Sequence, residues 1–198
     1  MLQSSLRAPV TKIITPLCRG LLKIGLTANG VTILGTVASV ATSIFLIPNG
    51  HLLAATLAIT VFVLLDLLDG TMARLSEQGS NKWGALLDST LDRISDAALL
   101  GAILWYLEKN NQSLSLVVLF NIILGYLISY IKAKAESLDI ECNGGFAERT
   151  ERLIITLVSL GVAGLGYPMV LVLGMWVLFL ASLLTVFQRF QIVYRSAK

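Results

Sequence analysis

Five aspartates lie in or beside apolar segments at spacings that would align them on helices. Asp66 and Asp69 are three residues apart, and Asp88, Asp92 and Asp96 follow one another at intervals of four. Each set would share one helix face, and the second set would form a stripe of carboxylates about 12 Å long. A carboxylate buried in an apolar medium is costly unless a positive charge neutralises it. The pattern therefore predicts a site that holds cations.

The ligand types indicate a hard divalent cation. Carboxylates without neighbouring His or Cys pairs suit Mg²⁺, Mn²⁺ or Ca²⁺ better than zinc. We expect Arg93 to point about 100° away from Asp92, so that it cannot neutralise the set. The sole histidine, His51, is expected to be a solvated loop residue. Asp96 lies one helical turn further into the apolar segment than Asp92, and it either binds metal or only orients its neighbours. The alternative for the whole set is a network of capping or protonated side chains that holds the helices together.

A second group of residues could bind an anion. Ser129 and Lys132 would share one helix face, Arg149 and Arg152 another, and Arg189 ends the last apolar segment. Cations from three segments would then meet at one end of the apolar segments. The alternative is the ordinary enrichment of Lys and Arg on the cytoplasmic side of membrane proteins.

We expect these residues to be carried by membrane helices. The chain has 198 residues, 56% hydrophobic and 14% charged, a composition that excludes an ordinary soluble domain. The formal charge of +3 reflects one basic face rather than nucleic-acid binding. A helix needs roughly 20 apolar residues to cross the hydrocarbon region. The predicted fold is an all-α integral membrane protein with six transmembrane helices, at about residues 31–48, 52–73, 84–107, 114–131, 153–167 and 168–188.

The distribution of charge predicts the topology. Thirteen of the 15 Lys and Arg residues would lie on one side, which favours cytoplasmic termini and a cytoplasmic site in the plasma membrane. Residues 4–25 place apolar side chains at helical spacing among Arg and Lys, which predicts an interfacial amphipathic helix. Cys18 and Cys142 would face the cytoplasmic side, where we expect free, structural thiols. We expect no cleavable signal, and one membrane domain over residues 1–198.

The aspartate pattern resembles a known signature. Eight positions over 27 residues reproduce the order of the CDP-alcohol phosphatidyltransferase motif: Asp66, Asp69, Gly70, Ala73, Arg74, Gly84, Asp88 and Asp92. The interval from Arg74 to Gly84 is one residue longer than the family usually has. Further segments, such as LDSTLDRISDAA and GGFAERTERLII, are most similar to the actinobacterial phosphatidylinositol phosphate synthases of this family.

The resemblance implies a six-helix homodimer that transfers the phosphatidyl group of CDP-diacylglycerol to myo-inositol phosphate and releases CMP. It implies two Mg²⁺ ions, or Mn²⁺, held by Asp66, Asp69 and Asp88, with Asp92 as the base and a further metal contact. The positions implied for the CDP group are Asn29, Gly30, Val31, Thr32, Gly70, Arg74 and Ser80. Those implied for the acceptor phosphate are Ser129, Lys132, Arg149, Arg152 and Arg189.

Other functions fit parts of the pattern. Transfer to glycerol 3-phosphate would make phosphatidylglycerol phosphate, and its acceptor also carries a phosphate. A cation transporter could use intramembrane carboxylates, although the aspartates lie toward one end of the segments rather than at a midplane between repeats. A nonenzymatic scaffold would not need the complete aspartate set.

Overall fold

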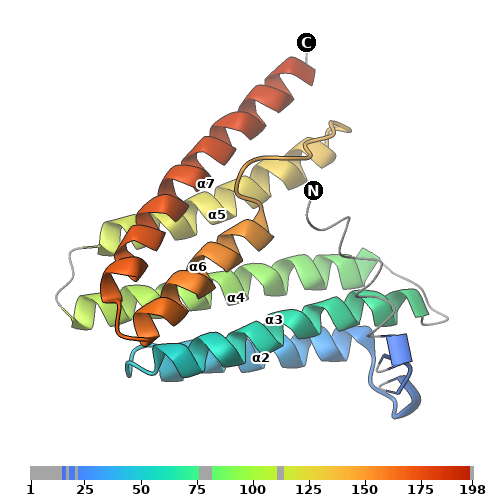
Figure 1. Cartoon of the computed structure of the whole chain (residues 1–198). Helices are drawn as coiled ribbons and strands as arrows, with labels where there is room; N and C mark the ends of the chain where they lie inside the picture. The colour runs from blue at the N-terminus through green and yellow to red at the C-terminus, as the bar shows by residue number, and fades with distance from the viewer. Residues whose placement is uncertain (1–14, 17, 21, 76–81, 111–113, 197–198) are drawn as a thin grey trace. The chain divides into compact units, whose positions relative to one another are not determined.

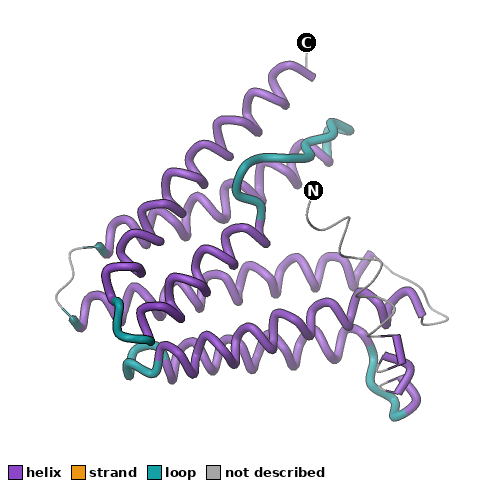
Figure 2. Tube along the Cα trace, viewed as in Figure 1, coloured by secondary structure: helices purple, strands orange, loops and turns teal. Residues whose placement is uncertain are grey.

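The computed structural model describes residues 15–16, 18–20, 22–75, 82–110 and 114–196. Within these ranges all regular secondary structure is helical (Figure 2). Seven α3 residues, 65–67, 69, 70, 73 and 74, are placed as backbone but their side chains lie outside the described part. The prediction of an all-α chain is therefore confirmed for the described residues.

Each of the six predicted apolar segments corresponds to a helix in Figure 1. The helices are α2 (Ala28–Leu46), α3 (Leu52–Leu75), α4 (Lys82–Lys109), α5 (Ser115–Glu136), α6 (Arg149–Gly164) and α7 (Pro168–Ser196). In the described residues, α2, α5 and α7 are long and apolar enough to cross a membrane, and Leu52–Leu64 forms a shorter apolar helix segment. The structure thus has the helices of the predicted bundle, with three of them as candidate spans.

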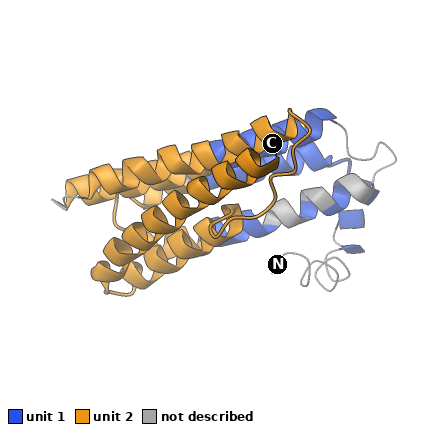
Figure 3. Ribbon diagram, turned by 90° about the horizontal axis from the view of Figure 1, so that it is seen from above, with its two compact units in different colours: residues 1–41, 58–95 blue, residues 42–57, 96–198 orange. Residues whose placement is uncertain are grey.

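The chain divides into two compact units (Figure 3). Unit 1 comprises residues 1–41 and 58–95, and unit 2 comprises residues 42–57 and 96–198. Helix α4 contributes its first half to unit 1 and its second half to unit 2. The predicted metal and CDP positions consequently belong to unit 1, and the predicted acceptor positions belong to unit 2.

The core of unit 1 joins the segment before α2 to α2 and α3. Val31, Leu68 and Met72 pack with the buried thiol of Cys18, which contacts the Leu68 carbonyl oxygen at 3.6 Å. Residues 15–16, 18–20 and 22–23 are helical, in agreement with part of the predicted interfacial helix, whereas residues 1–14 lie outside the described ranges. Thr27 begins α2 as its cap, because its hydroxyl oxygen accepts a hydrogen bond from the Gly30 amide at 3.1 Å.

The core of unit 2 is built where α7 packs against α5 and α6. Its centre is apolar and includes Ile128 of α5, Val186 of α7 and Cys142, which follows α5. The amide of Asn121 donates to the Met175 carbonyl oxygen at 3.0 Å and ties α5 to α7. Small residues allow close helix contact, since a Cβ at Gly174 of α7 would collide with Ser159 of α6. Both cysteines are free, as predicted, and both are buried.

Candidate functional site

Helix α4 presents two of the predicted metal ligands in unit 1. Asp88 is exposed and Asp92 is half-buried, one helical turn later. Nη1 of Arg93 lies 3.4 Å from Oδ2 of Asp92 and also donates to the Ser89 carbonyl oxygen at 3.0 Å. The expectation that Arg93 points away from Asp92 is therefore wrong. Its long side chain folds back along the helix toward the preceding turn, which brings the guanidinium beside the neighbouring carboxylate.

The other half of the predicted metal set lies on α3. Asp66 and Asp69 belong to this helix, but their side chains are outside the described part, as are those of Ala73 and Arg74. Among the described residues, no group of three or more His, Cys, Asp or Glu side chains could hold a metal ion. That finding leaves the predicted set untested, because it contains two undescribed carboxylates. Asp88 and Asp92 offer oxygen ligands one turn apart on α4, and a hard divalent cation fits such donors.

The start of α2 carries four of the predicted CDP contacts. Asn29 and Gly30 are half-buried, whereas Val31 and Thr32 are buried. Val31 packs into the core of unit 1, and the Thr32 hydroxyl donates to the Ala28 carbonyl oxygen at 3.0 Å. Side-chain contact with a nucleotide is thus favoured for Asn29 over Val31 and Thr32. Of the remaining predicted CDP positions, Gly70, the Arg74 side chain and Ser80 lie outside the described residues.

In unit 2, Arg189 of α7 joins α5 to the connection between α5 and α6, residues 137–148. The arginine is only 3% exposed. Its Nη1 donates to the Ile128 carbonyl oxygen at 2.6 Å, and its Nε donates to the Gly144 carbonyl oxygen at 3.1 Å. Nη2 lies 3.6 Å from Oε1 of Glu148. The predicted anion ligand is therefore also a structural tie.

The same connection is fixed to α7 at two further points. The Phe146 amide donates to the Gln188 side chain at 3.0 Å, and the Ala147 amide donates to the Thr185 hydroxyl at 2.8 Å. Gly145 has a φ of +122°, and a Cβ built there would lie 2.5 Å from the Thr185 methyl group. Glycine is required at this position by both its backbone conformation and the lack of space.

Arg149 and Arg152 of α6 share one carboxylate. Nε of Arg149 lies 3.5 Å from Oδ1 of Asp96, and Nη2 of Arg152 lies 3.5 Å from Oδ2 of the same residue. Arg152 is buried, and its Nη1 donates to the Ala147 carbonyl oxygen at 3.2 Å. Asp96 is thus grouped with the predicted acceptor cations. Of the two roles that the sequence left open, these contacts favour orientation of neighbouring side chains.

Two of the predicted cations approach one turn of α5. Arg189 bonds to Ile128, and the Arg152 guanidinium lies against Gly125, within 3.7 Å of the position that a Cβ would take. Ser129 is in the same turn, and its hydroxyl donates to the Gly125 carbonyl oxygen at 3.1 Å. The structure therefore brings Ser129, Arg152 and Arg189 together. Lys132 is one turn further along α5, where its ion pair is with Glu136 at 3.9 Å.

Sequence reasoning missed the carboxylate of Glu148 and the carbonyl groups that hold the arginines. The only local signal for Glu148 is its position beside Arg149 at the start of α6, and this does not indicate pairing with Arg189. The guanidinium groups of Arg149, Arg152 and Arg189 face the carboxylates of Asp96 and Glu148. Clustered guanidinium groups of this kind can bind a phosphate.

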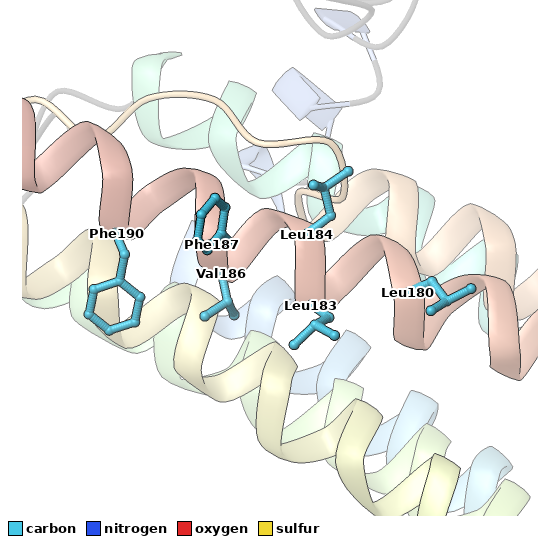
Figure 4. A pocket seen from close by; sticks show the side chains of 6 residues that line it. All are labelled: Leu180, Leu183, Leu184, Val186, Phe187 and Phe190. Atoms are coloured by element: carbon cyan, nitrogen blue, oxygen red, sulfur yellow. The ribbon is translucent and has the colours of Figure 1, made fainter.

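A hollow on α7 differs in chemistry from this cluster. Its volume is about 460 Å³, and Figure 4 shows that its walls are Leu, Val and Phe side chains of α7. The residues are Leu180, Leu183, Leu184, Val186, Phe187 and Phe190. Without a charged or polar side chain in its walls, this hollow does not suit a phosphate or a metal ion.

Comparison with known proteins gives consistent matches along the chain. A model of the CDP-alcohol phosphatidyltransferase family matches residues 25–187. The phosphatidylinositol phosphate synthase of Mycobacterium tuberculosis is 45% identical over 195 residues, which cover 96% of this chain and 89% of the relative. The enzyme of the same name from Corynebacterium glutamicum is 38% identical over 193 residues, covering 96% and 88%.

Solved structures extend the similarity to the fold. The crystal structure of the Mycobacterium tuberculosis phosphatidylinositol phosphate synthase with CDP-DAG bound has a TM-score of 0.88 and 45% identity, and the match covers 93% of this chain and 95% of that chain. A structure of the same enzyme in complex with manganese and citrate has a TM-score of 0.87 at 45% identity, covering 92% and 89%.

Proposed function

The chain belongs to the CDP-alcohol phosphatidyltransferase family, and we propose that it transfers the phosphatidyl group of CDP-diacylglycerol to myo-inositol phosphate. The products are phosphatidylinositol phosphate and CMP. The observation that carries this proposal is the eight-position aspartate motif, in a chain 45% identical to a phosphatidylinositol phosphate synthase over 96% of its length. The cluster of Arg149, Arg152 and Arg189 supports an acceptor that bears a phosphate.

The donor and metal positions are proposed to lie in unit 1. Asp66, Asp69, Asp88 and Asp92 would hold two divalent cations, Mg²⁺ or Mn²⁺. When bound, these ions supply positive charge that neutralises the pyrophosphate and the leaving group. Support for a divalent cation comes from the oxygen ligands of Asp88 and Asp92 and from the manganese complex of the 45% identical relative.

The CDP group is assigned to the start of α2 and the end of α3. Asn29 and Gly30 are half-buried there, and the backbone of Val31 and Thr32 completes the first turn of α2. The α3 side of this site would use Gly70 and Arg74, with Ser80 following α3. Arg74 suits a phosphate because its planar guanidinium donates two parallel hydrogen bonds.

The transfer step needs a base for the acceptor hydroxyl. We assign this role to Asp92, whose carboxylate is 14% exposed and is oriented by Arg93 at 3.4 Å. The hydroxyl oxygen of inositol phosphate attacks the lipid-side phosphorus, its proton passes to Asp92, and the phosphorus–oxygen bond to CMP breaks. The new phosphodiester joins diacylglycerol to inositol phosphate, and CMP departs with the electron pair of the broken bond.

The acceptor phosphate is assigned to the arginine cluster of unit 2, with Ser129 and Lys132 beside it on α5. Arg149 is the most exposed of the three arginines, with 25% of its side chain accessible against 10% for Arg152 and 4% for Arg189. It is therefore the cation best suited to direct contact with the phosphate. Arg152 and Arg189 add positive charge from more deeply buried positions.

The architecture proposed for this membrane protein follows its family. Residues 1–198 would form one domain with six transmembrane helices and a cytoplasmic interfacial helix over residues 4–25. The termini and the site would face the cytoplasm at the plasma membrane, as the distribution of Lys and Arg favours. We propose a homodimer.

Purified protein incubated with CDP-diacylglycerol, Mg²⁺ and a panel of alcohols tests the proposal through CMP release. We expect turnover with inositol phosphate, and poor turnover with free inositol and glycerol 3-phosphate. Arg149→Ala should raise the acceptor KM about ten- to 150-fold, because the variant loses the free energy of one charge-assisted hydrogen bond to the phosphate. The exposed Lys134→Ala variant is the matched control. Preference for glycerol 3-phosphate would overturn the acceptor assignment, and absence of CMP release with every alcohol would overturn the reaction.

A further inference from the structure

We propose that Asp96 is a positioning residue of the acceptor site and not a member of the metal set. Its carboxylate would hold Arg149 in the orientation that receives the acceptor phosphate, with Arg152 as the fixed point of the arrangement. This inference rests on the proposed function, because it assigns a role within acceptor binding. The carboxylate stripe of α4 then has two roles, since Asp88 and Asp92 serve the metal and the base, whereas Asp96 serves the arginines.

The geometry around Asp96 carries the inference. Its two oxygens face different arginines of α6, Oδ1 toward Nε of Arg149 at 3.5 Å and Oδ2 toward Nη2 of Arg152 at 3.5 Å. All three residues lie in unit 2. A carboxylate that already faces two guanidinium groups is a poor candidate for binding a metal ion as well. The same arrangement defines the relative positions of two arginines three residues apart.

The two arginines differ in how firmly they are held. Arg152 has only 10% of its side chain exposed, donates to the Ala147 carbonyl oxygen at 3.2 Å and packs against Gly125 of α5. Arg149 is more exposed and faces Asp96 through Nε. That contact is an ion pair without a hydrogen bond between Nε and Oδ1, and we assign the guanidinium of Arg149 to the phosphate. Fixing this orientation in advance lowers the entropy lost when the acceptor binds.

Charge and position make opposite predictions for the loss of Asp96. Asp96→Asn removes a negative charge from the vicinity of an anion site, so electrostatic attraction alone would lower the KM for a phosphorylated acceptor. If Asp96 positions Arg149, the same change releases the guanidinium and raises this KM. The direction of the change in acceptor KM therefore distinguishes a positioning role of Asp96 from a purely electrostatic effect of its charge.

The test compares wild-type protein with Asp96→Asn and Asp96→Glu. The control is Asp139→Asn, which removes an exposed carboxylate at φ 57°, a conformation that Asn tolerates. CMP release gives the KM for inositol phosphate, the KM for CDP-diacylglycerol and the Mg²⁺ concentration for half-maximal rate. Thermal unfolding with increasing inositol phosphate, without the donor, reports acceptor binding independently of turnover.

We expect Asp96→Asn to raise the acceptor KM at least about tenfold, because a displaced Arg149 would lose one charge-assisted contact with the phosphate. The variant should also weaken thermal stabilisation by inositol phosphate. The donor KM and the Mg²⁺ dependence should stay within about twofold of the Asp139→Asn control. Asp96→Glu should fall between wild type and Asp96→Asn, and it carries the test if Asp96→Asn does not fold.

Distinct results would overturn the inference. A rise in the Mg²⁺ requirement of Asp96→Asn would make Asp96 a metal ligand, and an unchanged or lower acceptor KM would exclude positioning. If wild type prefers glycerol 3-phosphate, the same comparison is made with that acceptor, so the proposed acceptor fails while Asp96 is still tested. If wild type releases no CMP with any alcohol and inositol phosphate does not shift its unfolding, the proposed function and this inference both fail.

Discussion

Replacement of Arg189 by alanine should destabilise unit 2 as well as weaken acceptor binding. The side chain is 4% exposed and donates to two backbone carbonyl oxygens, those of Ile128 at 2.6 Å and Gly144 at 3.1 Å. A hydrogen bond from a charged donor contributes about 1.5 to 3 kcal/mol, so the two together contribute about 3 to 6 kcal/mol. The pair with Glu148 adds little, because the Glu148 side chain is 39% exposed.

The lower end of that range sets the expected shift. For a chain of this size, 1 kcal/mol corresponds to about 2 to 4 °C in melting temperature, so a loss of about 3 kcal/mol predicts a fall of about 6 to 12 °C. Thermal unfolding in detergent micelles measures it. Arg195→Ala is the matched control, since Arg195 is exposed in the last turn of the same helix.

Local opening gives a second measurement on the same variant. Loss of the Gly144 contact should loosen residues 137–148, so a glutamate-specific protease should cut after Glu141 faster than in wild type or Arg195→Ala. Folded Arg189→Ala protein should also show a raised KM for inositol phosphate. A melting temperature within about 2 °C of the Arg195→Ala value, together with unchanged cleavage, would refute the claim that Arg189 ties α5 and α7 to this connection.

Three further changes address the metal set, the base and the close contact at Gly145. Asp66→Asn, Asp69→Asn or Asp88→Asn should lower turnover at least about a hundredfold, roughly 3 kcal/mol of lost charge stabilisation, and chelation should act likewise. Near-normal CMP release at saturating Mg²⁺ would remove that residue from the metal set. Asp92→Asn should abolish CMP release while CDP-diacylglycerol binding, measured by equilibrium titration, is retained; parallel loss of both would make Asp92 chiefly a metal ligand. Gly145→Ala should lower the melting temperature more than Gly144→Ala, because both positions have positive φ but only at Gly145 would the added Cβ meet Thr185; equal shifts would contradict this steric reason.

The periodicity of the sequence was sufficient to predict the helices and the stripe on α4. Asp88, Asp92 and Asp96 do lie on one continuous helix, Lys82–Lys109, because a spacing of four residues is a local property of the backbone. The free cysteines were predictable from their expected location. Six membrane crossings and the metal ligands Asp66, Asp69, Asp88 and Asp92 stay predictions.

The partners of the charged side chains were decided only by tertiary structure. Asp96 reaches Arg152 across 56 residues of sequence, and Arg189 reaches Ile128 across 61. Such pairs depend on which helix faces meet and in what register, which the spacing within a single helix does not specify. A sequence therefore determines that carboxylates and arginines stand at helical spacing, whereas packing determines that the third aspartate of the stripe faces two arginines of α6. Burial makes the pairing matter, because charges removed from water must find partners within the protein.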